Sequence, residues 1–141
     1  MIPKFLSLQN KHLLPLKGLG TATNKNLKII IPEAISIGYR SIDTAKSYGN
    51  EPVIGSILSS LYEKNVIKRE ELFLSTKIKN VKNIDVEKEV VDSLKNFRTE
   101  YLDMALVHWP VGKVENGRPV QTPLHRSDIN TFSSFFYAKL L

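Results

Sequence analysis

Four side chains in this sequence have the types and spacing that acid–base chemistry needs. Asp43 and Tyr48 lie in the stretch "SIDTAKSYGNE". Lys77 follows "LFLST", and His108 ends "YLDMALVH". Three of these polar groups come directly after apolar runs, which is typical of buried strands that carry functional groups at their carboxyl ends. The four residues are therefore candidates for one shared site.

Together these groups could form a proton-donating site. A tyrosine hydroxyl has a reference pKa of about 10, too high for an efficient acid near neutrality, but a nearby ammonium favours the phenolate and lowers that value. Lys77 is placed to supply that charge, and Asp43 to hold the ammonium. His108 could hydrogen-bond a carbonyl oxygen and orient it.

Each residue also has an ordinary structural explanation. Asp43 could cap the turn that follows it, and Tyr48 could be a half-buried aromatic residue of a loop. Lys77 could be a solvent-exposed lysine near the start of a helix, and His108, which precedes Trp-Pro, could be a structural histidine with its hydrogen bonds satisfied. The joint pattern favours a site over four unrelated residues.

The elements that must position these residues alternate along the chain. After a small hairpin near the amino terminus, strands are expected at 18–21, 39–45, 72–76 and 101–108. Three helices are expected. The first covers 27–37. The second follows Asn50-Glu51-Pro52 and has an apolar face made of Ile54, Ile57, Leu58 and Leu61, and the third runs from Asp85, a plausible cap, to Phe97. This alternation predicts βαβ units, a parallel sheet and an α/β fold.

Two architectures fit the alternation, an open doubly wound sheet and part of a (β/α)8 TIM barrel. About four strands and three helices follow the hairpin, whereas a barrel has eight of each and typically needs about 250 residues. Pro32 falls inside the first expected helix, where a proline costs about 3 kcal/mol unless the helix begins there.

Composition narrows the function classes. The chain has 141 residues and a net charge of +6, but its basic residues are scattered and usually have acidic neighbours, which disfavours nucleic-acid binding. An anionic ligand such as a phosphorylated cofactor remains compatible with the charge. There is no cysteine, and the three histidines lack metal-ligand spacing, so no metal site is expected. The absence of a long apolar run or signal-like start predicts a cytoplasmic protein with no membrane partner.

Four segments closely resemble the aldo-keto reductase family. They are "LPLKGLGT" at 14–21, "AISIGYRSIDTAKSYGNEPVIG" at 34–55, "IKREELFLSTK" at 67–77 and "SLKNFRTEYLDMALVHWP" at 93–110. The resemblance implies a (β/α)8 barrel that binds NADPH (NADP+) in an extended pose and reduces small carbonyl substrates, aldehydes and ketones, by direct hydride transfer.

The resemblance also assigns roles to residues. It implies that Tyr48 is the general acid, Lys77 and Asp43 its tuning pair, and His108 the carbonyl-orienting residue. The cofactor-binding residues would be Gly20, Thr21, Asp43 and Lys77. The residues that meet the substrate would be Tyr48, His108 and Trp109.

Some positions depart from the family pattern. Many relatives have a tryptophan where this chain has Ala22 and an aromatic residue where it has Lys79. Both differences would remove apolar wall from a substrate pocket. The likeness fades after Pro110, and nothing resembles the family's fifth to eighth strands.

The expected organisation is a single truncated aldo-keto reductase domain over 1–141, with an N-terminal hairpin at 1–16, βα units 1 to 4 at 17–110, and a divergent loop and tail at 111–141. Reductase activity is then expected to be impaired. The alternative is a noncatalytic half-barrel that associates with itself, or with a full-length reductase, through exposed sheet edges.

Overall fold

A four-stranded parallel sheet forms the centre of the computed structural model, which describes residues 4–8, 11–23, 25–78, 85–108, 111–115 and 118–123. The strands lie in chain order: β3 (Leu19–Gly20), β4 (Ser41–Asp43), β5 (Phe73–Ile78) and β6 (Met104–Val107). Every neighbouring pair is parallel. The predicted α/β fold is confirmed.

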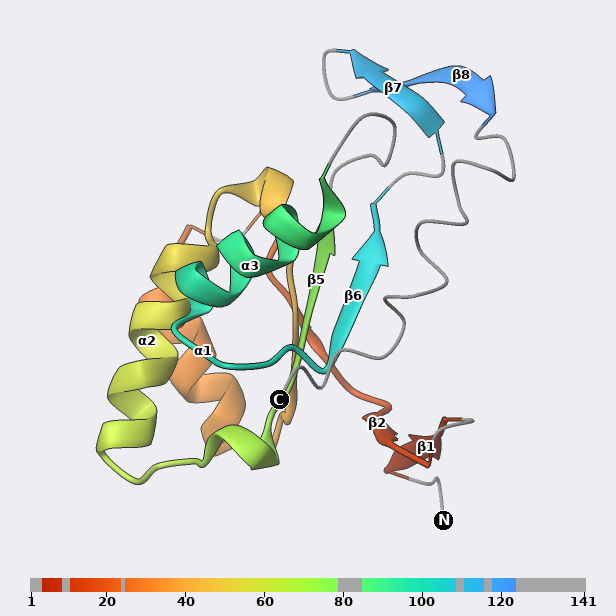
Figure 1. The fold of residues 1–141 in the computed structure, drawn as a ribbon. Helices are drawn as coiled ribbons and strands as arrows, with labels where there is room; N and C mark the ends of the chain where they lie inside the picture. The colour runs from red at the N-terminus through yellow and green to blue at the C-terminus, as the bar shows by residue number, and fades with distance from the viewer. Residues whose placement is uncertain are drawn as a thin grey trace.

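Three helices connect the strands and lie together on one face of the sheet (Figure 1). They are α1 (Leu27–Ser36), α2 (Glu51–Glu63) and α3 (Val86–Phe97). Two short 3-10 turns, η1 (Lys46–Tyr48) and η2 (Arg69–Glu71), lead into α2 and β5. The helical periodicity read from the sequence therefore corresponds to real helices, within the usual difference of a residue or two at each end.

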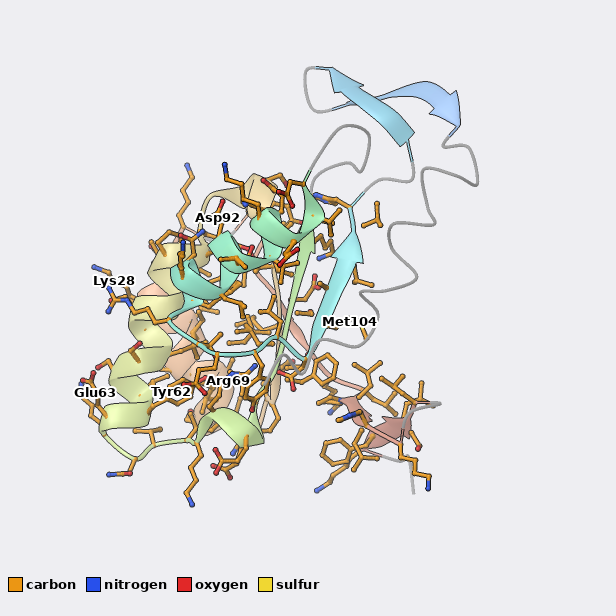
Figure 2. The ribbon with its side chains drawn as sticks, viewed as in Figure 1. Lys28, Tyr62, Glu63, Arg69, Asp92 and Met104 are labelled. Atoms are coloured by element: carbon orange, nitrogen blue, oxygen red, sulfur yellow. The ribbon has the colours of Figure 1, made fainter. Side chains whose placement is uncertain are left out.

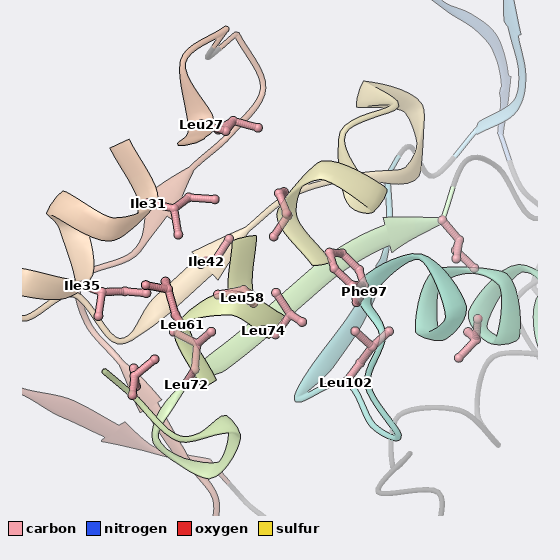
Figure 3. Close-up of a cluster of buried hydrophobic side chains, with 14 of the residues drawn as sticks. Leu27, Ile31, Ile35, Ile42, Leu58, Leu61, Leu72, Leu74, Phe97 and Leu102 are labelled. Atoms are coloured by element: carbon pink, nitrogen blue, oxygen red, sulfur yellow. The ribbon is translucent and has the colours of Figure 1, made fainter. Parts of the chain in front are cut away.

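The hydrophobic core fills the layer between the helices and the sheet (Figure 3). Each helix contributes residues spaced to lie on one face, and the strands contribute aliphatic side chains from below. Its labelled members include Leu27, Ile31 and Ile35 from α1, Leu58 and Leu61 from α2, Ile42 and Leu74 from the sheet, and Phe97 from α3. This packing fixes the strands whose ends carry the candidate residues.

The first helix contains its proline. Helix α1 begins at Leu27 and continues through Pro32 to Ser36, so the alternative in which the helix begins at Pro32 is wrong. Proline has no N–H to donate to the carbonyl one turn earlier. The burial of Leu27, Ile31 and Ile35 against the core explains why the helix extends across this position nonetheless.

Helices α2 and α3 approach each other closely at Gly55. A Cβ atom built on Gly55 would lie 2.2 Å from the Asn96 carbonyl oxygen and 2.7 Å from the Phe97 Cα. Only glycine fits this contact without a backbone shift. The Asp85 side chain caps α3 as predicted, accepting a hydrogen bond of 3.0 Å from the Lys88 backbone N–H.

A cluster around Arg69 closes the amino ends of β5 and β6. The guanidinium donates to the carbonyl oxygens of Leu72 and Tyr101 and forms a 2.7 Å ion pair with Asp103. Asp103 also accepts 2.8 Å from the Leu74 backbone N–H. Figure 2 shows Arg69 near the end of the molecule where β5 begins. This end of the sheet is occupied by structural contacts.

Two hairpins flank the central unit. The predicted N-terminal hairpin is present as β1 (Phe5–Ser7) and β2 (Leu13–Pro15). A second antiparallel hairpin, β7 (Val111–Glu115) and β8 (Arg118–Pro123), lies within the segment 111–141 that was expected to be a divergent loop and tail. Residues 124–141 of the expected tail lie outside the described residues. Among the described helices, none has the length and apolarity needed to cross a membrane.

Candidate active site

The parallel register brings the ends of β4, β5 and β6 to one edge of the sheet. Asp43 pairs with Ser75, and Lys77 pairs with Leu106. The His108 backbone N–H donates 2.9 Å to the Ile78 carbonyl, so this residue continues the pairing just past β6. The sequence-predicted residues on three different strands therefore share one edge, here called the rim.

The Lys77 ammonium and the Asp43 carboxylate form the central ion pair of the rim, with Nζ and Oδ2 separated by 2.5 Å. The ammonium also donates 2.8 Å to the Thr44 carbonyl oxygen. The other carboxylate oxygen of Asp43 accepts 2.9 Å from the hydroxyl of buried Ser75. Both charged groups are thus fixed by partners as well as by each other.

Tyr48 is the last residue of η1, in the loop that follows β4. Gly49 follows with φ +68°, a left-handed conformation that favours glycine and turns the chain into α2. Lys46 anchors the same turn to α3, with its Nζ 3.1 Å from Glu89 Oε2 and 3.6 Å from Asp92 Oδ2. The turn that carries Tyr48 is therefore attached to α3.

Asn50 fixes the other end of this loop. Its amide nitrogen donates 3.1 Å to the Thr21 carbonyl, and its amide oxygen accepts 2.7 Å from the Thr44 hydroxyl. The Thr21 hydroxyl and backbone N–H both donate 3.1 Å to the Asp43 carbonyl. The ends of β3 and β4 and the start of α2 are tied together by this amide.

Tyr48, Lys77 and His108 lie close together. The tyrosine and histidine rings meet edge to face, with centroids 5.5 Å apart and planes at 82°. The Lys77 Nζ lies 5.8 Å from the Tyr48 ring centroid. The Ser47 hydroxyl lies 3.0 Å from His108 Nδ1. A hydroxyl, an ammonium and an imidazole are thus gathered beside one another at the rim.

The pKa of His108 is lowered below its usual value, first by burial and then by the Lys77 ammonium, while the Asp43 carboxylate acts in the opposite direction. Both leading causes disfavour the imidazolium. The neutral form of the ring, which both causes favour, has one nitrogen able to donate and the other able to accept a hydrogen bond.

A buried carboxylate supports the rim from below. Glu51, the first residue of α2, is 1% exposed. Its Oε1 accepts 2.8 Å from the Thr76 hydroxyl and 3.0 Å from the Ser93 hydroxyl, and its Oε2 accepts 3.0 Å from the Asn96 amide. Thr76 immediately precedes Lys77, so Glu51 joins the end of β5 to α2 and α3.

The remaining predicted residues differ in how they are placed. Gly20, at the end of β3, is exposed, and a Cβ built on it would meet no atom of the described residues within 4 Å. Thr21 is 1% exposed, with its polar groups bonded to Asp43 and Asn50. Trp109 lies outside the described residues. Among the described residues, no group of His, Asp and Glu side chains could hold a metal ion.

The sequence that folds into this arrangement matches a known protein family. The model of the aldo/keto reductase family matches residues 16–135. The chain belongs to the aldo/keto reductase family. The match extends past Pro110, the point at which the resemblance in sequence motifs was expected to fade.

Curated aldo/keto reductase relatives match most of this chain. The aldose reductase of Encephalitozoon cuniculi is 40% identical over 114 residues, which is 79% of this chain and 38% of that protein. The methylglyoxal reductase DkgA of Escherichia coli K12 is 37% identical over 116 residues, which is 81% of this chain and 41% of that protein. The chain thus spans about two fifths of the length of these relatives.

Solved aldo/keto reductase structures share the fold. The aldose reductase of Schistosoma japonicum superposes with a TM-score of 0.78 at 30% identity, over 94% of this chain and 48% of that one. A Bombyx mori aldo-keto reductase in complex with NADP gives a TM-score of 0.72 at 27% identity, over 84% and 42%. The described sheet and helices are therefore part of a TIM barrel fold.

Several residues that support the rim were not among the predicted site residues. They are Ser47, Ser75, Asn50 and Glu51. Asn50 and Glu51 stand in the same sequence block as Tyr48, so the block itself signalled that region. Ser47 and Ser75 gave no such signal, because a lone serine in a loop or strand has no distinctive spacing.

Proposed function

We propose that this aldo/keto reductase chain carries the catalytic groups of an NADPH-dependent carbonyl reduction. The observation that supports the proposal is the ion pair between Lys77 and Asp43 beside the edge-to-face pair of Tyr48 and His108. The names of the relatives point to small aldehydes such as methylglyoxal as substrates.

In the proposed reaction, Tyr48 gives its hydroxyl proton to the carbonyl oxygen as the carbonyl carbon becomes an alcohol carbon. The Lys77 ammonium stabilises the phenolate left behind, and Asp43 holds that ammonium in place. Neutral His108 donates a hydrogen bond to the same carbonyl oxygen and orients it. The nicotinamide, when bound, supplies the hydride that the carbonyl carbon receives.

The rim fits such a cofactor in part. The Asp43 side chain is 41% exposed, and a carboxylate can accept more hydrogen bonds than the two it receives from the described residues, so it can also accept from a sugar hydroxyl. The open space over Gly20 leaves room for a ligand beside β3. Thr21 does not fit as a hydrogen-bonding ligand, because its side chain is buried and bonded to Asp43. Its proposed role is to hold the rim.

The first test is a titration of the purified chain with NADPH, in which quenching of protein fluorescence reports binding. The second is an assay of methylglyoxal reduction on the same sample. We expect saturable binding and slow turnover that Tyr48→Phe abolishes. Since the phenylalanine variant keeps the ring and loses only the hydroxyl, its NADPH binding should remain. Turnover that persists in Tyr48→Phe would contradict the proposed acid.

A second candidate function is a noncatalytic partner that pairs with another copy of this chain. It is favoured by the exposed apolar side chains of the β1–β2 hairpin, where Phe5, Leu6 and Leu13 are 45%, 51% and 57% exposed. A patch of this kind is typical of an interaction surface. The molecular mass in solution tests this function, and a strictly monomeric chain that binds NADPH would exclude it.

A further inference from the structure

The hydroxyl of Ser47 lies within hydrogen-bonding distance of the imidazole of His108. The two atoms, Oγ and Nδ1, are 3.0 Å apart, although the residues are separated by 61 positions in the chain. Ser47 lies within η1, next to Tyr48, so this contact joins the turn that carries the proposed acid to the residue that follows β6.

The contact acts on a ring whose orientation is already constrained. Tyr48 meets the His108 ring edge to face, which limits its tilt, and the backbone of His108 is fixed by its hydrogen bond to Ile78. The hydrogen bond to Ser47 sets which nitrogen faces η1. The Nε2 atom, at the opposite corner of the ring, is therefore directed away from this turn.

The hydrogen bond also bears on where the proton resides. A neutral imidazole carries one N–H and one acceptor nitrogen, and the partner of one nitrogen determines the state of the other. If the Ser47 hydroxyl donates to Nδ1, the proton lies on Nε2. If Nδ1 donates to Ser47, then Nε2 has only a lone pair and cannot donate to a carbonyl oxygen.

We infer that Ser47 is a positioning residue that donates to Nδ1 of His108 and thereby selects the tautomer protonated at Nε2. The inference deepens the proposed carbonyl reduction and rests on it, because only that tautomer lets the neutral ring donate to the same oxygen that Tyr48 protonates. Among the described residues, the charged groups that act on the pKa of His108 are Lys77, which lowers it, and Asp43, which raises it.

The test reads the tautomer directly and needs no turnover. In a chain labelled with ¹⁵N-histidine at about pH 8, where histidine is neutral, long-range ¹H–¹⁵N correlation spectra separate protonated from unprotonated ring nitrogens. His108→Asn identifies the His108 signals. We expect His108 to carry its proton on Nε2, and Ser47→Ala to shift the tautomer ratio roughly fivefold toward Nδ1, as loss of one ordinary hydrogen bond would do.

Two matched variants complete the design. Ser47→Thr keeps a hydroxyl and should restore the wild-type ratio. Ser56→Ala removes an exposed serine hydroxyl from α2 and should leave the ratio unchanged. A wild-type proton on Nδ1, or a ratio that Ser47→Ala does not change, would overturn the inference. Absence of carbonyl reduction with the Nε2–H tautomer intact would instead count against the proposed function.

Discussion

His108 links the electrostatics of the rim to the stability of the chain. Burial and the Lys77 ammonium lower its pKa in the folded state, so the unfolded chain takes up this proton at a higher pH than the folded chain does. Between those two pH values the unfolded state holds more protons. The free energy of unfolding therefore falls as the pH drops below about 6.5.

We predict that His108→Gln makes this acid-dependent loss smaller. The measurement compares urea midpoints at about pH 8 and about pH 5, on either side of the ordinary histidine pKa. His12→Gln, at an exposed position before β2, is the matched control for the loss of a histidine elsewhere. An unchanged difference between the two midpoints in His108→Gln would contradict the prediction.

Tyr62 carries a polar group that the described part of the chain leaves without a hydrogen-bond partner. Its hydroxyl is buried, and burial raises its pKa to about 12, with the nearby Arg69 acting in the opposite direction. Figure 2 shows Tyr62 and Arg69 near one another at the end of the molecule where β5 begins. An unpaired buried hydroxyl costs free energy without adding a contact.

We predict that Tyr62→Phe is neutral or stabilises the chain by about 1 kcal/mol at neutral pH, since it removes that unpaired hydroxyl and keeps the ring. It should also reduce the loss of stability between pH 10 and 12, where the unfolded phenol loses its proton before the folded one. Urea unfolding at neutral and alkaline pH measures both effects. A destabilisation above about 1 kcal/mol would reveal a hydrogen bond that stabilises the fold.

At this scale the sequence could predict residue types but not all contacts. The shared edge of Asp43, Lys77 and His108 was predictable because each lies at or just after the carboxyl end of a strand, and parallel strands bring such residues together. The contact of Ser47 with His108 was not predictable. It depends on how η1 places its side chains at the rim, beside a residue that lies 61 positions further along the chain. Secondary-structure patterns carry no information on side-chain direction in such a turn.

At the scale of elements, the Glu51 side chain connects α2, on which it lies, to β5 and α3 through hydrogen bonds. Its carboxylate is buried and accepts hydrogen bonds from Thr76, Ser93 and Asn96. Hydrogen bonds to a charged acceptor contribute more than neutral ones, and a buried donor that loses its partner is costly. The packing of the rim therefore depends on a residue that does not face it.

We predict that Glu51→Ala lowers the free energy of unfolding by about 3 kcal/mol or more, because it removes the acceptor of two buried hydroxyls, those of Thr76 and Ser93, and of the partly buried Asn96 amide. Glu51→Gln should cost less, since its oxygen still accepts from Thr76 and the Asn96 amide can rotate to accept from the new NH₂ group. Chemical denaturation measures both. Glu33→Ala, at an exposed position in α1, is the control, and an equal effect there would refute the role of Glu51.

The order and type of the elements were predictable, but some of their details were not. Alternating apolar runs and helical periodicity identified β4, β5, β6 and the three helices. Pro32 suggested a later start for α1, which its buried face overrides. The β7–β8 hairpin was not predicted, because the apolar residues of its two strands do not alternate regularly, although Asn116-Gly117 between them is a dipeptide typical of a hairpin turn.

At the scale of the whole molecule, the β1–β2 hairpin presents exposed apolar side chains through which the chain could associate. Leu6 and Leu13 are both more than half exposed. In Figure 1 this hairpin lies apart from the helical layer, beyond the end where β6 begins. A second copy could cover these side chains without disturbing the rim at the opposite end of the strands.

We predict that the mass of the chain in solution rises with concentration and that Leu6→Glu combined with Leu13→Glu removes the rise, because a charge is costly to bury in an interface. Sedimentation velocity over a concentration series measures this. The matched control is Ile29→Glu, a similar change at an exposed position of α1. Association that persists in the double variant would assign the interface to another surface.

The order of the strands has a consequence for how the chain folds. Because β3, β4, β5 and β6 are neighbours in space in the order in which they occur in the chain, each parallel pair closes over a single intervening helix. Contacts of short sequence separation are the ones that form fastest, and synthesis adds them from the amino terminus onward. We therefore expect the rim to form in steps, with Asp43 and Tyr48 in place first, Lys77 second, and His108 last, after β6 pairs with β5.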